Sequence, residues 1–425
     1  MDVVAILLVV IFLTAIVAIA FESSLGVNKS WIALLAGTSM WMIASMGAEK
    51  SHLDHALQEG STEIFELIVF LIGAMTIVEM MGHFRFFTWL ENKLISLHIS
   101  NYQLFWILGF ITFVSSAVLD NLTTTLVMIH VGRFLYIRKE NFNIFLINTI
   151  IAANAGGAMS PVGDITTLMM WLAEKFTAWQ VLLYGLLPSL VAWVIPQHLL
   201  TRQIVKEDRE GRTSEELLPF EWYMIFLGFM TFGFAVLVNL FHLPPFFGIL
   251  FGLGAAAIII DFRLKHGQLK KKANQIVNVI RHIDMTTITF FIGILLAVNA
   301  LGYYGILEQL ANLLYGVNPG SNENKLIIGH SIIGIVSAVF DNVPLTAATI
   351  DMLPAGIHFQ YWILLAITAG TGGSILVIGS AAGVAAMGQV PELTIAYYLK
   401  KGTLPALLGY IMAVVTWYVQ SLIIL

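Results

Sequence analysis

The sequence predicts an all-α polytopic membrane protein with two inverted-topology repeats, each containing a re-entrant helical hairpin and an interrupted transmembrane helix. Of its 425 residues, 58% are hydrophobic and only 11% are charged, whereas soluble domains carry about 25% charged residues. Apolar runs long enough to cross a bilayer recur along the whole chain. The hexapeptide "SAVLDN" at 116–121 returns as "SAVFDN" at 337–342.

The composition excludes several classes of protein. The formal charge of −5 is small and the basic residues fall in loops, so nucleic acid is not an expected partner. The chain has no cysteine, which excludes disulfides and thiolate metal sites. No nucleophile–base pair or metal-binding motif is present in the sequence, so we do not expect an enzyme.

Apolar runs of about 17–22 residues predict complete crossings. The first run lacks a basic n-region and a cleavage site of small residues, so we expect a retained span and not a signal peptide. The predicted crossings are 3–21, 30–47, 63–82, 142–175, 178–200, 222–240, 244–261, 284–302, 359–398 and 403–424.

Two segments, 102–137 and 325–357, are too long for one crossing and short for two. A re-entrant hairpin of two half-length helices fits each of them, with the Asp-Asn pair at the turn. The long spans 142–175 and 359–398 contain glycine-rich stretches, which predict broken helices.

The loops 201–221 and 262–283 hold most of the basic residues, so the positive-inside rule makes them cytoplasmic. This orientation leaves only Lys50, Lys175 and Lys325 outside. We therefore expect a multi-pass protein of a plasma membrane, such as the bacterial inner membrane.

Matched blocks extend the repeat beyond the hexapeptides, since "FLIG" at 70–73 matches "FFIG" at 290–293 and "ANAGGAM" at 153–159 matches "AGTGGSI" at 369–375. In transporters with inverted repeats, the substrate site lies near the midplane where the repeats meet. The predicted organisation is a two-helix scaffold part (1–62), the first repeat (63–200), cytoplasmic loops with a two-helix linker (201–283) and the second repeat (284–425).

Asp120 and Asp341 are ionisable groups at predicted membrane depth, which makes them functional candidates. The alternative is that each only caps the second helix of its hairpin, because Asp is a strong N-cap. Pro344 suits the first turn of such a helix and supports capping. Both roles are compatible in one residue.

The broken spans add further oxygen atoms, from Asn154, Asp164, Thr166 and Thr167 in the first and from Ser374 in the second. Unwound carbonyls, hydroxyls and carboxylates are what a hard cation prefers. The alternative is small-residue helix packing, which is common in membranes.

The two repeats differ in charge, because Asp164 aligns with Ser380 and Glu79 with Asn299. The sequence has no Lys or Arg between Lys139 and Lys175, or between Lys325 and Lys400. Acids without a basic partner favour a cation, and burial raises the pKa of a carboxyl group, so a proton and a cation can compete for the same oxygens. Glu79, near the end of its span, is a secondary candidate for the proton path.

The chain resembles the NhaD family of sodium/proton antiporters, which shares a superfamily with arsenite permeases and dicarboxylate carriers. The resemblance is carried by "SSAVLDNLTTT" at 115–125, "SPVGDITTLMMW" at 160–171 and "SAVFDNVPLTA" at 337–347. It implies Na⁺ or Li⁺ exchange for H⁺, no cofactor, and a dimerising scaffold beside a mobile transport domain, with Na⁺ at Asp120, Asn121, Asp164, Asp341 and Asn342. The family's functional positions fall on these five residues and on Ser116, Asn154, Thr166, Thr167, Ser337 and Ser374.

Two other classes stay open. A carrier of arsenite or dicarboxylate anions would share the fold but would need a site of different charge. A channel would also suit oxygen-lined breaks, although inverted repeats with re-entrant tips favour alternating access.

Overall fold

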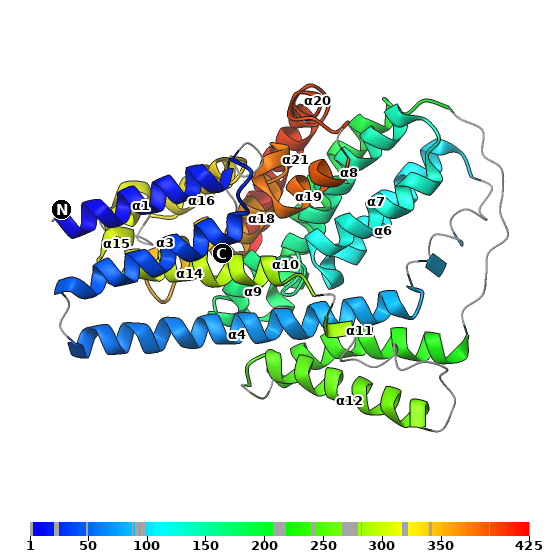
Figure 1. Cartoon of the computed structure of the whole chain (residues 1–425). Coiled ribbons are helices and arrows are strands. Elements are labelled where there is room, and N and C mark those ends of the chain that lie inside the picture. The colour runs from blue at the N-terminus through cyan, green and yellow to red at the C-terminus, as the bar shows by residue number, and fades with distance from the viewer. Residues whose placement is uncertain are drawn as a thin grey trace. The chain divides into compact units, whose positions relative to one another are not determined.

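The computed structural model of the chain is built of α-helices with short 3₁₀ turns, and the residues it describes include no strand, as predicted (Figure 1). It describes residues 3–20, 25–47, 50–86, 88–89, 93, 99–206, 218–239, 241, 243–265, 279–281, 283–316, 322–339, 342–390 and 392–424.

The chain folds into two compact units. Unit 1 comprises residues 1–62, 101–206 and 289–425, and unit 2 comprises residues 63–100 and 207–288. Both hairpins and both broken helices belong to unit 1, so the candidate site can be described within this unit alone.

Among the residues that the structure describes, seven helices are long and apolar enough to cross a membrane, which confirms the multi-pass prediction. They lie in α4 (Lys50–His83), α6 (Asn101–Leu119), α10 (Ala178–Thr201), α11 (Pro219–Asn239), α12 (Phe246–Lys265), α14 (Met285–Tyr303) and α21 (Thr403–Ile424). The predicted crossings at 3–21 and 30–47 appear as α1 (Val3–Ala20) and α3 (Lys29–Ala44).

Both predicted broken spans are interrupted at their glycine-rich stretches. In the first, α8 (Lys139–Ala158) ends before α9 (Ile165–Leu172) begins. In the second, α18 (Phe359–Gly372) is followed by a 3₁₀ turn, η3 (Val377–Gly379), and then by α19 (Ala381–Gln389).

The second broken span is shorter than the predicted 359–398. A separate helix, α20 (Ile395–Lys401), begins after α19 ends, and Thr394 caps it by accepting a hydrogen bond from the Tyr397 backbone N–H. Pro391 in the intervening sequence lacks the N–H that a continuous helix needs.

Each predicted hairpin segment forms two consecutive helices: α6 and α7 (Asn121–Leu135) in the first, and α16 (Glu323–Val336) and α17 (Asn342–Met352) in the second. The prediction of half-length helices is wrong for α6, whose 19 residues are enough for a full crossing. Helix α4 is also longer than the predicted 63–82, because its polar first turns continue the helix without a break. Hydropathy marks only the apolar part of a helix.

The centre of unit 1 is formed by α8 and α18. Almost every residue of α8 from Asn141 onward is buried, and so is every residue of α18 from Gln360 onward. A helix that is apolar on all sides belongs in an interior. These helices pack against each other and against α10, while α6 covers α8 and α16 covers α18. The second helix of each hairpin packs against the broken span of the other half of the chain: α7 packs against α19, and α17 packs against α9.

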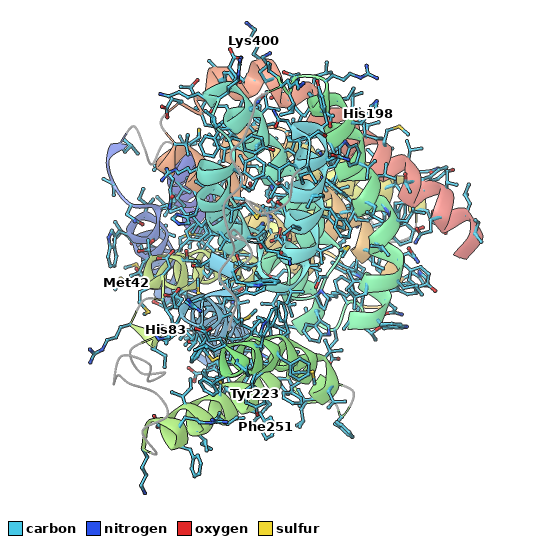
Figure 2. The ribbon with its side chains drawn as sticks, turned by 90° about the vertical axis from the view of Figure 1, so that its right-hand side faces the viewer. Met42, His83, His198, Tyr223, Phe251 and Lys400 are labelled. Atoms are coloured by element: carbon cyan, nitrogen blue, oxygen red, sulfur yellow. The ribbon has the colours of Figure 1, made fainter. Side chains whose placement is uncertain are left out.

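Unit 2 contains the part of α4 from residue 63 and the helix pair α11 and α12, which run side by side (Figure 1). Small residues allow the pair to approach closely, because a Cβ at Gly248 would meet the Phe234 backbone. Figure 2 shows Tyr223 and Phe251 on the outside of this pair, where they are 47% and 65% exposed. Large exposed apolar side chains suit a lipid-facing surface.

Candidate functional site

The carboxylate of Asp164 lies where both hairpin tips meet the first broken helix. Its Oδ2 accepts hydrogen bonds from the Asn121 side-chain amide at 3.1 Å and from the Asn342 side-chain amide at 3.3 Å. Asp164 is only 3% exposed. The structure therefore brings together three predicted site residues from α7, α17 and the break before α9.

Asn154, near the end of α8, connects this centre to the second broken helix. Its Oδ1 accepts from Asn121 Nδ2 at 3.1 Å, and its Nδ2 donates to Ser374 Oγ at 2.8 Å and to Ser380 Oγ at 2.9 Å. All of these side chains are buried. One hydrogen-bonded network thus joins the tip of the first hairpin to both breaks.

Four helix N-termini meet this network. Asp164 caps α9 and accepts from the Thr166 backbone N–H at 3.2 Å, while Ser380 caps α19 and accepts from the Gly383 N–H at 3.2 Å. Asn121 and Asn342 are the first residues of α7 and α17. The N-terminus of a helix favours negative charge. At α9 this position is occupied by the protein's own Asp164 carboxylate.

Asp120 caps α7, in agreement with the capping reading. Its Oδ1 accepts from the Thr123 backbone N–H at 2.7 Å and its Oδ2 from the Thr123 hydroxyl at 2.8 Å. Its backbone has φ 74° and ψ 159°, a region that is essentially restricted to glycine and costs about 1–3 kcal/mol. Strain of this kind is concentrated at functional sites. Asp341, its predicted counterpart, lies outside the described residues.

Ser116 and Ser337 hold the hairpins against the central helices. Ser116 Oγ donates to the Ala153 carbonyl at 2.6 Å, and Ser337 Oγ donates to the Ala369 carbonyl at 2.9 Å. Each serine lies just before its hairpin tip, and each carbonyl lies near the end of its central helix. Their hydroxyls position the backbone around the site.

Glycines set the close packing at the breaks. A Cβ at Gly163 would lie 2.5 Å from the Ser116 carbonyl oxygen, and a Cβ at Gly379 would lie 2.5 Å from the Ser337 carbonyl oxygen. Real Cβ atoms are not found so close to backbone. The hairpins can therefore approach the breaks only where glycine is present.

Thr166 and Thr167 lie in the first turn of α9 and are both fully buried. Within the described part of the chain, neither hydroxyl has a hydrogen-bond partner. Unpartnered buried hydroxyls next to Asp164 are oxygen atoms that an ion or a water molecule can use.

Glu79 belongs to unit 2, in α4, and its side chain is exposed. The network around Asp164 belongs to unit 1. The candidacy of Glu79 for the proton path stays a prediction.

Two residues of the network, Ser380 and Tyr398, were not among the predicted site residues. Ser380 bonds Asn154 and caps α19, and the Tyr398 hydroxyl donates to the Ser374 carbonyl at 2.7 Å. The alignment of Ser380 with Asp164 was the available signal for the first. No sequence signal pointed to Tyr398, because its contact with Ser374 arises only from the tertiary fold.

The site can hold a small cation or a proton. Among the residues that the structure describes, no group of three or more His, Cys, Asp and Glu side chains converges. The network instead offers one carboxylate, amide oxygens and hydroxyls, which are hard oxygen donors. The amide oxygens of Asn121 and Asn342 have no hydrogen bond within the described residues.

Comparison with known proteins places the chain in a family. The family model described as citrate transporter (CitMHS) matches residues 9–370. "Sodium/proton antiporter 1" of Arabidopsis thaliana is 38% identical over 405 residues, covering 92% of this chain and 68% of the relative. "Na(+)/H(+) antiporter NhaD" of Alkalimonas amylolytica is 33% identical, covering 90% of this chain and 83% of the relative. The protein of the same name from Vibrio parahaemolyticus is 34% identical, covering 85% and 92%.

These matches extend over nearly the whole chain and confirm the resemblance found in the three sequence blocks. The chain belongs to the NhaD family of sodium/proton antiporters, within the wider citrate-transporter family.

Proposed function

We propose that the protein is a secondary transporter that exchanges Na⁺ or Li⁺ for H⁺, and that the cation and the proton compete for the Asp164 carboxylate. The observation that carries this proposal is the position of Asp164 Oδ2, which accepts amide hydrogen bonds from both hairpin tips while the side chain is almost fully buried. The names of the antiporter relatives support the same substrates.

The charge of the site favours a cation over an anion. A bare helix N-terminus attracts anions, but here the N-termini of α7, α9 and α19 are capped by the side chains of Asp120, Asp164 and Ser380. A dicarboxylate or an arsenite anion would have to approach these acidic side chains, and the sequence places no Lys or Arg in 140–174 or 326–399 that could bind an anion. The anion-carrier alternative is therefore not favoured.

Asn121 and Asn342 can serve both states of the carboxylate. An ionised Asp164 accepts from their NH₂ groups, as in the present structure. A protonated Asp164 becomes a donor, for which an amide oxygen is the matching acceptor. When Na⁺ binds to the carboxylate, the same amide oxygens are available as ligands. A single O–H needs only one acceptor, and rotation of the Asn342 amide can supply it while Asn121 keeps its hydrogen bond to Asn154.

Alternating access requires the site to open to each side in turn. We propose that the segments 63–200 and 284–425 are inverted repeats, that 102–137 and 325–357 are re-entrant hairpins, and that their tips close the site from opposite sides. The paired serine–carbonyl bonds and glycine contacts at corresponding positions support a duplicated origin. Asp120, Asp341, Thr166 and Thr167 are proposed as further oxygen donors, and Glu79 as a secondary proton-path residue.

The proposed assembly is a homodimer in the bacterial inner membrane, with the loops 201–221 and 262–283 in the cytoplasm. This orientation rests on the distribution of basic residues. In unit 1, Lys400 and the α10 residue His198 lie near the same end (Figure 2), as expected if both face the cytoplasm.

The test is ion flux through the purified protein in proteoliposomes that carry a pH gradient. Addition of Na⁺ or Li⁺ should dissipate the gradient, while K⁺ should do so weakly and citrate or arsenite not at all. Liposomes without protein provide the control. Citrate uptake without any response to Na⁺ would contradict the proposal and favour the anion carrier.

A further inference from the structure

Threonine hydroxyls in helices usually donate to the carbonyl of the residue four positions earlier. This chain follows the rule at many buried positions. Thr112 Oγ1 donates to the Leu108 carbonyl at 2.7 Å in α6, and Thr349 Oγ1 donates to the Leu345 carbonyl at 2.7 Å in α17. Other buried threonines leave the hydroxyl without a hydrogen-bond partner within the described residues: Thr124, Thr125, Thr149, Thr166, Thr167 and Thr346.

Among these, Thr125 in α7 and Thr346 in α17 form a pair at corresponding positions of the second hairpin helices. Both are 0% exposed, and neither hydroxyl has a hydrogen-bond partner within the described residues. They occupy corresponding positions, since "DNLTTT" and "DNVPLT" place each of them four residues after the hairpin-tip asparagine. The neighbouring Thr124 has no such counterpart, because Leu345 stands in its place.

The helix geometry relates these hydroxyls to the site. Residues four apart lie on the same face of a helix, about 5–6 Å apart at Cβ, and side chains lean toward the helix N-terminus. Thr125 therefore lies one turn behind Asn121, and Thr346 one turn behind Asn342. Both asparagines donate to Asp164 Oδ2. Each hydroxyl thus leans toward the centre of the site along its own hairpin helix.

The neighbours of the two helices are those of the site itself. Helix α7 packs against α8, which carries Asn154, and against α19, which begins after its cap residue Ser380. Helix α17 packs against α9, which begins after its cap residue Asp164, and against α18, which ends just before Ser374. The helix of each hydroxyl therefore packs against elements that hold different parts of the network.

We propose that Thr125 and Thr346 are ligands for the transported cation on its way to and from Asp164, one on each side of the site. The inference rests on the proposed Na⁺/H⁺ exchange and on its inverted hairpins, which place Thr125 toward the cytoplasm and Thr346 toward the outside. An ion that loses its hydration water on the way to a buried site needs protein oxygen atoms to replace that water. A hydroxyl not already bonded to its own helix can supply one without breaking a helix hydrogen bond.

A purely structural role predicts a different outcome on mutation. Valine has nearly the shape of threonine but no hydroxyl, and a buried hydroxyl without a partner is unfavourable for folding. If the hydroxyls only fill space, Thr125→Val and Thr346→Val should leave transport unchanged. If they bind the ion, these variants should bind Na⁺ less well while their melting temperature stays equal to or above that of the unmodified protein.

The test compares everted with right-side-out membrane vesicles, in which added Na⁺ meets the cytoplasmic or the outer face. We expect Thr125→Val to raise the KM for Na⁺ by about five- to tenfold in everted vesicles and by less than about twofold in right-side-out vesicles, a size typical of one lost polar contact. Thr346→Val should show the opposite pattern. Thr125→Ser and Thr346→Ser, which keep the hydroxyl, should restore the KM.

Thr112→Val and Thr349→Val are matched controls, because their hydroxyls are already bonded within their helices, and the KM should be unchanged at both faces. Unchanged KM values in Thr125→Val and Thr346→Val, equal defects in the Val and Ser variants, or defects that do not depend on the face would each overturn the inference. If the unmodified protein shows no Na⁺-dependent proton flux, the proposed function fails, and this inference with it.

Discussion

The two breaks of unit 1 end in cap residues with the same backbone conformation but different chemistry. The residue that caps the helix after the break has φ −144° and ψ 143° at Asp164, and φ −139° and ψ 152° at Ser380. The serine–carbonyl bonds of Ser116 and Ser337 are matched in the same way. The backbone frame is therefore present twice, whereas the carboxylate is present in only one of the two caps.

This difference separates what builds the site from what binds the ion. Asp and Ser are both good N-caps, so the helix after the break begins equally well with either residue. Only Asp carries a negative charge that can attract a cation or take up a proton. The comparison teaches that the fold sets the positions while the difference at one aligned position sets the charge.

The largest expected effect comes from removing that charge. Asp164→Asn keeps the size and the capping ability of the side chain but should reduce Na⁺-driven proton release in everted vesicles to the level of vesicles without the protein. Ser380→Ala should keep most of the exchange and lose about 0.5–2 kcal/mol of stability, because α19 loses its cap. Equal transport defects in the two variants would contradict the unequal roles of the breaks.

The same experiment applies to the two acids at the hairpin tips. If Asp120 and Asp341 bind the ion as well as cap their helices, Asp120→Asn and Asp341→Asn should also lose exchange while the proteins still insert and fold. Exchange at the unmodified rate in both variants would leave these two residues as caps alone.

The hairpin-tip amides should give the next largest effect. Asn121→Ala and Asn342→Ala each remove a donor to Asp164 Oδ2 and should raise the KM for Na⁺ by about tenfold or more. Asn121→Ala should be the more harmful, because Asn121 also donates to Asn154. Na⁺ titration of proteoliposome flux measures both values. A stronger defect in Asn342→Ala would reverse the comparison.

The smallest expected effect concerns the close glycine–backbone contacts at the two breaks. The loss of stability should be equal in the two halves. Gly163→Ala and Gly379→Ala each place a Cβ 2.5 Å from a backbone carbonyl oxygen, and each should lower stability by about 1–3 kcal/mol. Thermal unfolding in detergent provides the readout. Gly233→Ala is the matched control, because no atom lies within 4 Å of the added Cβ. Destabilisation in only one of the two variants would show that the frames differ.

Local signals made much of this architecture predictable. Glycines mark the breaks before α9 and α19, hydropathy marks the apolar spans, and polar residues within apolar runs mark Asn121, Asp164 and Asn342. The length of α6 and the early start of α4 could not be predicted in this way, because a helix continues through polar residues that hydropathy leaves out.

Contacts between distant parts of the chain were not predictable. Capping of α7 by Asp120 is local and was predicted, but Asn154 bonds Ser374 and Ser380, which are more than 200 positions away in the chain. Sequence spacing identified the residues that carry the oxygens. It could not identify which carboxylate lies at the centre of the network.

Competition between Na⁺ and H⁺ at Asp164 is the central claim, and the pH dependence of the Na⁺ dissociation constant tests it most directly. For each proton displaced, the apparent affinity should fall by up to about tenfold per pH unit below the pKa of the site and should level off above it. Titration calorimetry of the purified protein at a series of pH values gives this curve, and Asp164→Asn should show no measurable binding. A dissociation constant that stays flat from acid to alkaline pH would contradict the claim and assign the proton to a separate group.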